Sequence, residues 1–322
     1  MRRSGAKPSL GEEPASVSAP AATSGWRIFR GEEGWPQSLT ELPAVDEAEP
    51  QVLFGFGARD LLTEFDPDRT VTIVGSRRSG SYGREVAREL GFGAASAGLL
   101  VVSGMALGCD SAAHEGALDA NGATIAVLGG PADVPYPRSK EPLYRRILAS
   151  GGAVISEQPS GTETHPSFFP ARNRIMAALA GWVVIVEGAH RSGTQHTVKQ
   201  AAKLGREVLA VPGPVNSSLS ELPNELLSEG APVVRDAQDL LDHVLGPGQT
   251  QVRGVGPELE SELLAALIAV EGGAGTCDAV AMQLDLDGNA AAVALARLEL
   301  MGYVAGSAVG RYSRTQLTPP LP

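Results

Sequence analysis

Short apolar runs rich in valine and isoleucine recur along the middle of the chain, and a segment with a helical pattern follows each of them. Continuous apolar strands that alternate with helices are typical of a parallel sheet covered on both faces. We therefore expect an α/β fold: an extended Rossmann-like, doubly wound, mostly parallel sheet of about six or seven strands. The apolar runs lie at 71–75, 99–104, 124–130, 153–157, 182–188 and 207–213, and the helical patterns at 83–97, 109–121, 141–150, 171–180, 194–204 and 219–229.

The segments on either side of this repeat have different compositions and predict the domain organisation. The first segment is rich in Pro, Ser, Ala and Gly, which favours disorder. Near the end of the chain, three helical patterns and an alternating stretch indicate a small C-terminal winged-helix domain. The expected parts are a disordered tail at 1–25, an irregular flap at 26–70, the Rossmann-like domain at 71–245, a linker at 246–256 and the winged helix at 257–318.

Composition and charge narrow the class of protein. No apolar run reaches the roughly 18 residues of a membrane span, and the two cysteines, Cys109 and Cys277, are far apart. We expect a cytoplasmic protein without a disulfide framework. The net charge of −11 is unfavourable for nucleic acid, but residues 71–215 carry 14 basic and 11 acidic side chains. Because salt screens charges beyond about 10 Å, this local excess can still attract an anion.

The loop after the first apolar run, GSRRSGSYG at 75–83, has the composition of a phosphate cradle. It matches neither common fingerprint: Arg77 stands where a dinucleotide motif needs its second glycine, and Ser81 stands where a P-loop needs its lysine. The backbone from Gly75 and Ser76, together with the following helix start, predicts an anion site. Arg77 and Arg78 add charge and forked donors.

Three further loops follow apolar runs and carry glycines, basic residues or aromatic rings. Glycines such as Gly104 allow close approach of backbone to a ligand, and a serine-glycine turn that opens a helix is a second anion nest. Aromatic rings beside arginines suit single-stranded nucleic acid, because bases stack on rings while phosphates pair with guanidinium groups. The candidate residues are Ser103 and Gly104; Phe169, Arg172, Asn173 and Arg174; and Ser192, Gly193 and Thr194.

The sequence offers little for catalysis or metal binding. There is no strained G-x-S-x-G elbow for a nucleophile, and His190 and His196 lack a third ligand at useful spacing. Three acidic residues near run ends, Asp110, Glu157 and Glu187, are better explained as buried caps than as acids or bases. We therefore expect no enzyme activity, no metal and no cofactor.

The order of these motifs resembles the DNA-processing protein A family (DprA, also called Smf). The resemblance covers about residues 71–245, from VTIVGSRRSGSYG through FFPARNRIMAALA to RSGTQHTVKQAAKLGREVLAVPGPV, and LARLELMGYVAGSAVGRYSR near the end is similar to the family's winged helix. It implies a homodimeric protein that binds single-stranded DNA without base specificity and loads RecA recombinase during natural transformation.

The resemblance also implies which residues contact DNA. The family's basic residue after the Tyr-Pro pair falls on Arg138, and the other family motifs fall on the loops already named. Three positions depart from the family pattern: Leu107 replaces an arginine, no basic residue precedes Phe168, and only Asn224 remains of a Gly-Cys-Asn turn.

Two alternative functions remain open on the same fold. One is a phosphoribohydrolase-like enzyme that acts on nucleotides, although the comparable stretch RSGTQHTV lacks the glutamate such enzymes carry. The other is a module that senses a free nucleotide. The winged helix itself is acidic, with 3 arginines and 8 carboxylates in 254–322, which favours contact with a protein over duplex DNA.

Overall fold

The computed structural model describes residues 24–190, 192–250, 259–307, 310–314 and 317. Most of the expected N-terminal tail and of the expected linker therefore lies outside the described residues. Within them, no helix is long and apolar enough to cross a membrane.

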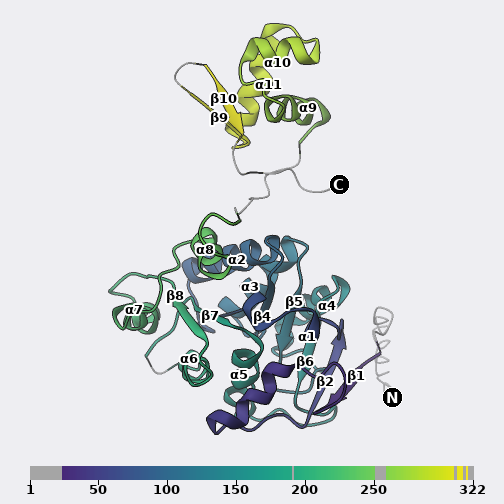
Figure 1. Ribbon diagram of the computed structural model, residues 1–322, viewed down its shortest axis with the longest axis vertical. Helices are drawn as coiled ribbons and strands as arrows, with labels where there is room; N and C mark the ends of the chain where they lie inside the picture. Colours follow the sequence, from purple (N-terminus) through teal and green to yellow (C-terminus); the bar gives the residue numbers. More distant parts are fainter. Residues whose placement is uncertain (1–23, 191, 251–258, 308–309, 315–316, 318–322) are drawn as a thin grey trace, which may run out of the picture.

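One sheet of eight strands organises the residues before 246, in the order β1-β2-β6-β5-β4-β3-β7-β8 (Figure 1). Six of the strands are mutually parallel and coincide with the six apolar runs. The predicted Rossmann-like, mostly parallel α/β architecture is confirmed. The parallel strands are β3 (Thr70–Val74), β4 (Leu100–Ser103), β5 (Thr124–Val127), β6 (Ala153–Ser156), β7 (Trp182–Ile185) and β8 (Glu207–Ala210).

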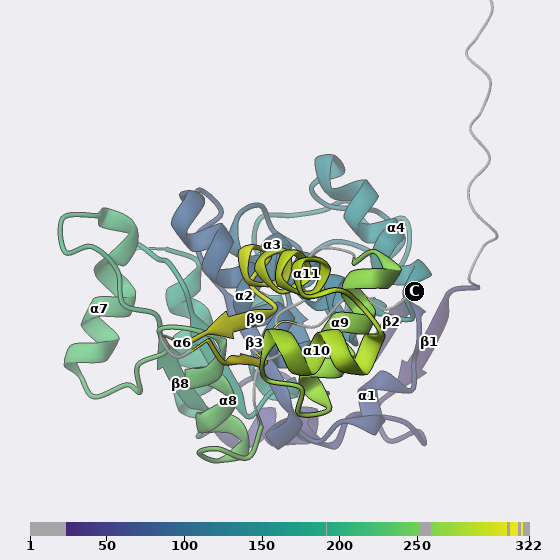
Figure 2. The same ribbon diagram turned by 90° about the horizontal axis from the view of Figure 1, so that it is seen from above.

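Residues 26–70 do not form the irregular flap that the sequence predicted. They contribute β1 (Trp26–Phe29) and β2 (Val52–Gly57), which extend the sheet beyond β6 as an antiparallel ribbon. Figure 2 shows this ribbon at the opposite edge of the sheet from β8. The sequence signal was weak because outward-facing positions of both strands carry phenylalanine, so that polarity does not alternate as it does in an ordinary half-buried strand. The rest of the segment forms η1 (Gln37–Val45), α1 (Leu61–Glu64) and η2 (Pro67–Arg69).

Helices cover both faces of the sheet because successive strand residues point to opposite sides. In β3, Val71 and Ile73 pack toward one helical layer, and Val74 packs toward the other. The first layer contains α2 (Ser81–Ser96), α3 (Cys109–Asp119), α4 (Glu141–Ala149) and α8 (Ala237–Leu245), and the second contains α5 (Phe168–Leu179), α6 (Thr194–Lys203) and α7 (Glu221–Ser228). Two short 3-10 helices, η3 (Arg138–Lys140) and η4 (Ser218–Ser220), lie in the connections.

A second unit with its own core follows residue 258. It contains α9 (Ser261–Glu271), α10 (Cys277–Leu284), α11 (Gly288–Leu300) and a hairpin of β9 (Val304–Gly306) and β10 (Tyr312–Arg314). Its core is built around Tyr303, which is fully buried. The order of three helices and a hairpin agrees with the expected order, while assignment to the winged-helix class stays a prediction.

Candidate functional site

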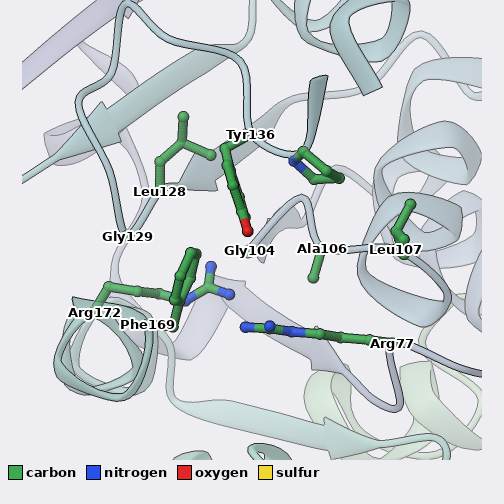
Figure 3. A pocket seen from close by; sticks show the side chains of 10 residues that line it. Arg77, Gly104, Ala106, Leu107, Leu128, Gly129, Tyr136, Phe169 and Arg172 are labelled. Carbon is green, nitrogen blue, oxygen red and sulfur yellow. The ribbon is translucent and has the colours of Figure 1, made fainter. Parts of the chain in front are cut away.

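A pocket opens where the parallel strands β3, β4 and β5 end, which is where ligands bind in open α/β sheets. Its volume is about 100 Å³. Figure 3 shows the side chains of Arg77, Tyr136, Phe169 and Arg172 converging on it from two loops and from α5. The remaining lining residues are Gly104, Ala106, Leu107, Leu128, Gly129 and Pro137.

Two glycines shape the floor of the pocket. A Cβ atom on Gly104 would overlap the guanidinium group of Arg172, and a Cβ atom on Gly129 would lie 2.8 Å from Cδ1 of Phe169. The first loop lacks the second glycine of a dinucleotide motif, but the loops after β4 and β5 each carry a glycine at the pocket. They let α5 bring a cation and an aromatic ring close to the backbone.

Phe169 is the centre of a stack. The Cζ atom of Arg77 lies 4.9 Å from the centroid of the Phe169 ring, within the range of a cation–π contact. The ring of Tyr136 lies 5.1 Å from the same ring, centroid to centroid, with the planes tilted by 38°. The pocket thus presents two aromatic rings beside the guanidinium group of Arg77. This arrangement suits an unpaired base and its phosphate.

Arg172 is held in the pocket wall by a buried carboxylate. Its Nη2 lies 3.7 Å from Oδ2 of Asp110, its Nη1 donates to the carbonyl of Val127, and its Nε donates to Asn173. Burial lowers the pKa of Arg172 to about 10, while the carboxylate of Asp110 opposes this shift. Burial likewise raises the pKa of Asp110, and the positive charge of Arg172 opposes it. The guanidinium is therefore positioned by the fold, with one edge on the pocket.

The N-terminus of α2, which the sequence suggested as a phosphate cradle, already holds a carboxylate. Glu187, two residues after β7, is 5% exposed, and its Oε2 accepts a hydrogen bond of 3.2 Å from the backbone N–H of Gly80. A Cβ atom on Gly83 would overlap this carboxyl group, so the glycine is what admits it. Desolvation raises the pKa of Glu187, and the N–H groups of Gly80 and Gly83 oppose that shift. This helix start is not free to bind a phosphate group.

At the start of α6, no carboxylate is found to accept a backbone hydrogen bond among the described residues, unlike at the start of α2. Gly193 precedes the helix without a side-chain hydrogen bond, and Thr194 is buried. The Oγ of Ser192 is buried without a hydrogen-bond partner in the described part of the chain. Asn173 of α5 donates to the carbonyl of Gly193 at 3.2 Å, which ties this loop to the helix that carries Phe169. The second anion nest therefore stays a candidate.

Arg174 does not face a ligand, contrary to the sequence prediction. Its side chain is 7% exposed and pairs with both oxygens of Glu157 at 2.7 and 2.8 Å. Its other groups donate to the backbone carbonyls of Ala48 and Ala171. Arg174 therefore holds α5 against the N-terminal segment.

Some of the other predicted residues form hydrogen bonds within the fold, and others are exposed near the pocket. The N–H of Gly75 donates to Asp110, and the carbonyl of Ser76 accepts from Cys109. Ser103 is buried and donates to the carbonyl of Ile73, so its hydroxyl joins β4 to β3 and is not available to a ligand. Arg78 and Arg138 are exposed, and Arg138 directly follows Pro137 at the pocket.

The three acidic residues expected as caps each accept a hydrogen bond: Asp110 from Gly75, Glu157 from Arg174 and Glu187 from Gly80. His190 pairs with Glu225 at 2.9 Å. Among the described residues, no group of three or more His, Cys, Asp or Glu side chains is arranged to hold a metal ion.

Sequence reasoning missed Gly129 and Leu128, and it named Tyr136 only as half of a motif. The double glycine at 129–130, directly after an apolar run, was the available signal. Leu107, 44% exposed, lines the pocket at the position where an arginine was expected. The rim is therefore more apolar there than in the pattern the sequence resembles.

Comparison with known proteins gives a match over the part of the chain that forms the eight-stranded sheet and its helices. The family model described as DNA recombination-mediator protein A matches residues 26–245. A DNA processing protein DprA from Mycobacterium tuberculosis is 44% identical over 195 residues, which are 61% of this chain and 49% of the relative. Protein Smf of Escherichia coli is 37% identical over 195 residues, 61% of this chain and 51% of that protein. The chain thus spans about half the length of these curated relatives.

Two solved structures are similar to the chain. The X-ray structure of DNA processing protein A from Streptococcus pneumoniae superposes with a TM-score of 0.60 and 36% identity, and the match covers 67% of this chain and 72% of that chain. DNA processing protein A from Helicobacter pylori, described for its single-stranded DNA binding mode, gives a TM-score of 0.60 at 26% identity, covering 69% and 95%.

Proposed function

The chain belongs to the DNA recombination-mediator protein A family, and from this premise we propose that it binds single-stranded DNA and delivers it to RecA recombinase during natural transformation. The observation that carries the proposal is the pocket at the sheet edge. There, two guanidinium groups and two aromatic rings lie together. A base can stack on a ring while its phosphate pairs with an arginine.

Glu187 favours this function over the nucleotide enzyme and the nucleotide sensor. A nucleotide held at the first loop would place its phosphates at the start of α2, and that helix start already accepts the carboxylate of Glu187. A polynucleotide needs only single contacts repeated along the chain. The protein then acts as a binder, without a chemical step.

Equilibrium binding of labelled oligo-dT and of a duplex of equal length, each at low and high salt, tests the proposal. We expect oligo-dT to bind more tightly, with log affinity falling by about 0.7 per phosphate neutralised for each log unit of salt. Salt-independent binding would contradict it. Incubation with nucleoside monophosphates separates the enzyme alternative, because free base is expected only from a phosphoribohydrolase.

RecA and a second copy of the chain are the partners we propose, within the cytoplasm. Support comes from the family and from exposed apolar side chains around α7 and α8, such as Val215 and Val233. RecA should begin hydrolysing ATP on single-stranded DNA sooner when the protein is present.

Light scattering should give the mass of a dimer, and a monomer mass at working concentration would contradict the dimer.

A further inference from the structure

The antiparallel ribbon of β1 and β2 has two different faces. Arg27 lies directly opposite Phe54, so both side chains are on one face, with Phe29 and Phe56 two residues along. The other face carries Ile28 and Leu53, which are buried in the core. We call the first set, Arg27, Phe29, Phe54 and Phe56, the aromatic face.

The phenylalanines of the aromatic face belong to none of the hydrophobic core clusters among the described residues. Phe54 and Phe56 are half-buried. Phe29 is 44% exposed, and the Cζ atom of Arg27 lies 5.5 Å from its ring centroid. The solvated face of an antiparallel ribbon normally carries polar side chains. Three phenylalanines out of seven in the chain therefore form a surface suited to a ligand.

A hollow of about 370 Å³ lies over this face. Phe54, Phe56 and Arg27 line it together with Ala132, Asp133 and Ser160. Asp133 is three residues from Tyr136, so their Cα atoms are no more than about 12 Å apart. Phe54 pairs with Ser156, the last residue of β6. The hollow is thus at the same carboxyl edge of the sheet as the pocket.

The charges in the hollow indicate what it binds. Arg27 supplies one cation, and Asp133, which accepts a hydrogen bond from Ser160, supplies one anion. A phosphate gains little where the charges balance, whereas an unpaired base can stack on a phenylalanine ring regardless of its sequence. Sheet faces with aromatic residues bind single-stranded nucleic acid in this way in other folds.

We propose that the aromatic face is a second, base-stacking subsite for the strand that occupies the pocket at Arg77. This rests on the proposed function, since it extends the same polynucleotide across the loop 131–137. Short oligonucleotides fill the pocket alone, and longer ones also reach the aromatic face. Its contribution comes from stacking, so it depends little on salt.

Phe54→Ala, measured by anisotropy with a short and a long oligo-dT, tests the subsite. Stacking is worth about 1–3 kcal/mol per base, so we expect long oligo-dT to bind at least about 5-fold more weakly at low and high salt, with short oligo-dT within about 2-fold of wild type. Phe54→Tyr should retain binding, because it keeps the ring, and Phe54→Leu should not. Phe92→Ala, another half-buried phenylalanine outside the core clusters, is the control.

Each other outcome has a definite meaning. Unchanged binding of long oligo-dT by Phe54→Ala and Phe54→Leu overturns the subsite and leaves the face to a protein partner. Equal weakening of short and long oligonucleotides also overturns it, since the residue then acts through the fold. If Arg77→Ala removes binding of both lengths while the Phe54 variants have no effect, the proposed function stands and only the subsite fails.

Discussion

At the scale of single residues, the site depends on side chains that lie directly against the backbone of glycines. Gly104 and Gly129 are needed because Arg172 and Phe169 occupy the space that a Cβ atom would take. Arg172 in turn remains charged in a buried position because the carboxylate of Asp110 forms an ion pair with it and the Val127 carbonyl accepts one of its N–H groups. Buried ion pairs of this kind are costly to break, so small substitutions should have large effects.

Gly104→Ala should displace the Arg172 guanidinium from Val127 and Asp110. We expect a loss of about 1–3 kcal/mol in the free energy of unfolding, the usual effect of overpacking, together with weaker oligo-dT binding. Gly288→Ala, at a position with no neighbour for a Cβ atom, is the control and should not lower stability. A Gly104→Ala protein with wild-type stability and binding would contradict this account of the pocket floor.

His114 should make the protein sensitive to acid. It is fully buried, its Nδ1 lies 2.7 Å from Oγ1 of Thr124, and burial lowers its pKa to about 3. The unfolded chain takes up a proton near pH 6.5 and the folded protein does not, so stability falls by up to about 1.4 kcal/mol per pH unit as pH drops from about 6.5 toward 3. Urea titrations between pH 5 and 7, a range above the ordinary pKa values of carboxylates, should show this slope in wild type. The control variant His196→Gln, which changes an exposed histidine, should show the same slope. A His114→Gln protein with the same slope as wild type would contradict it.

At the scale of elements, the six parallel strands could be predicted because each is buried on both faces and therefore reads as a continuous apolar run. The β1–β2 ribbon could not, because its outward face carries Phe29, Phe54 and Phe56, so that polarity does not alternate as it does in an ordinary half-buried strand. The role of Arg174 was equally hidden, since its partner Glu157 lies 17 residues earlier and sequence shows only a basic residue near a helix start.

Arg174 should matter for the attachment of α5 and not for a phosphate contact. Arg174→Ala leaves Glu157 and the Ala48 carbonyl without their donor, and we expect a loss of about 3 kcal/mol of stability, as for a broken buried pair. The double variant Arg174→Ala, Glu157→Ala should be less destabilised than the sum of the single variants. A stable Arg174→Ala protein that binds oligo-dT poorly would instead restore Arg174 as a DNA contact.

The start of α2 should become an anion site when its carboxylate is removed. Glu187→Ala frees the N–H of Gly80 and its neighbours, so sulfate or phosphate should raise the melting temperature of the variant more than that of wild type. Glu187→Gln keeps the side chain in place and serves as the control. If the anions stabilise wild type and Glu187→Ala equally, the carboxylate does not occupy the cradle.

At the scale of the whole molecule, the charge of −11 and the proposed binding of DNA are compatible because the cations are local. Arg77 lies in the pocket, with Arg78 and Arg138 exposed on loops at the same edge of the sheet. The net charge could be read from the sequence, but the position of these cations required the fold. The general repulsion of a polyanion should make binding especially dependent on salt.

The most direct measurement is therefore the affinity for oligo-dT as a function of salt for wild type, Arg77→Ala and Arg235→Ala. Arg235 is an exposed arginine just before α8, does not line the pocket and is paired with Asp239, and its variant should match wild type. Arg77→Ala should bind about 10-fold or more weakly, as expected for a charge-assisted hydrogen bond of about 1.5–3 kcal/mol, and its salt slope should fall by about 0.7. An Arg77→Ala protein with wild-type affinity and slope would contradict the claim that this pocket binds the DNA strand.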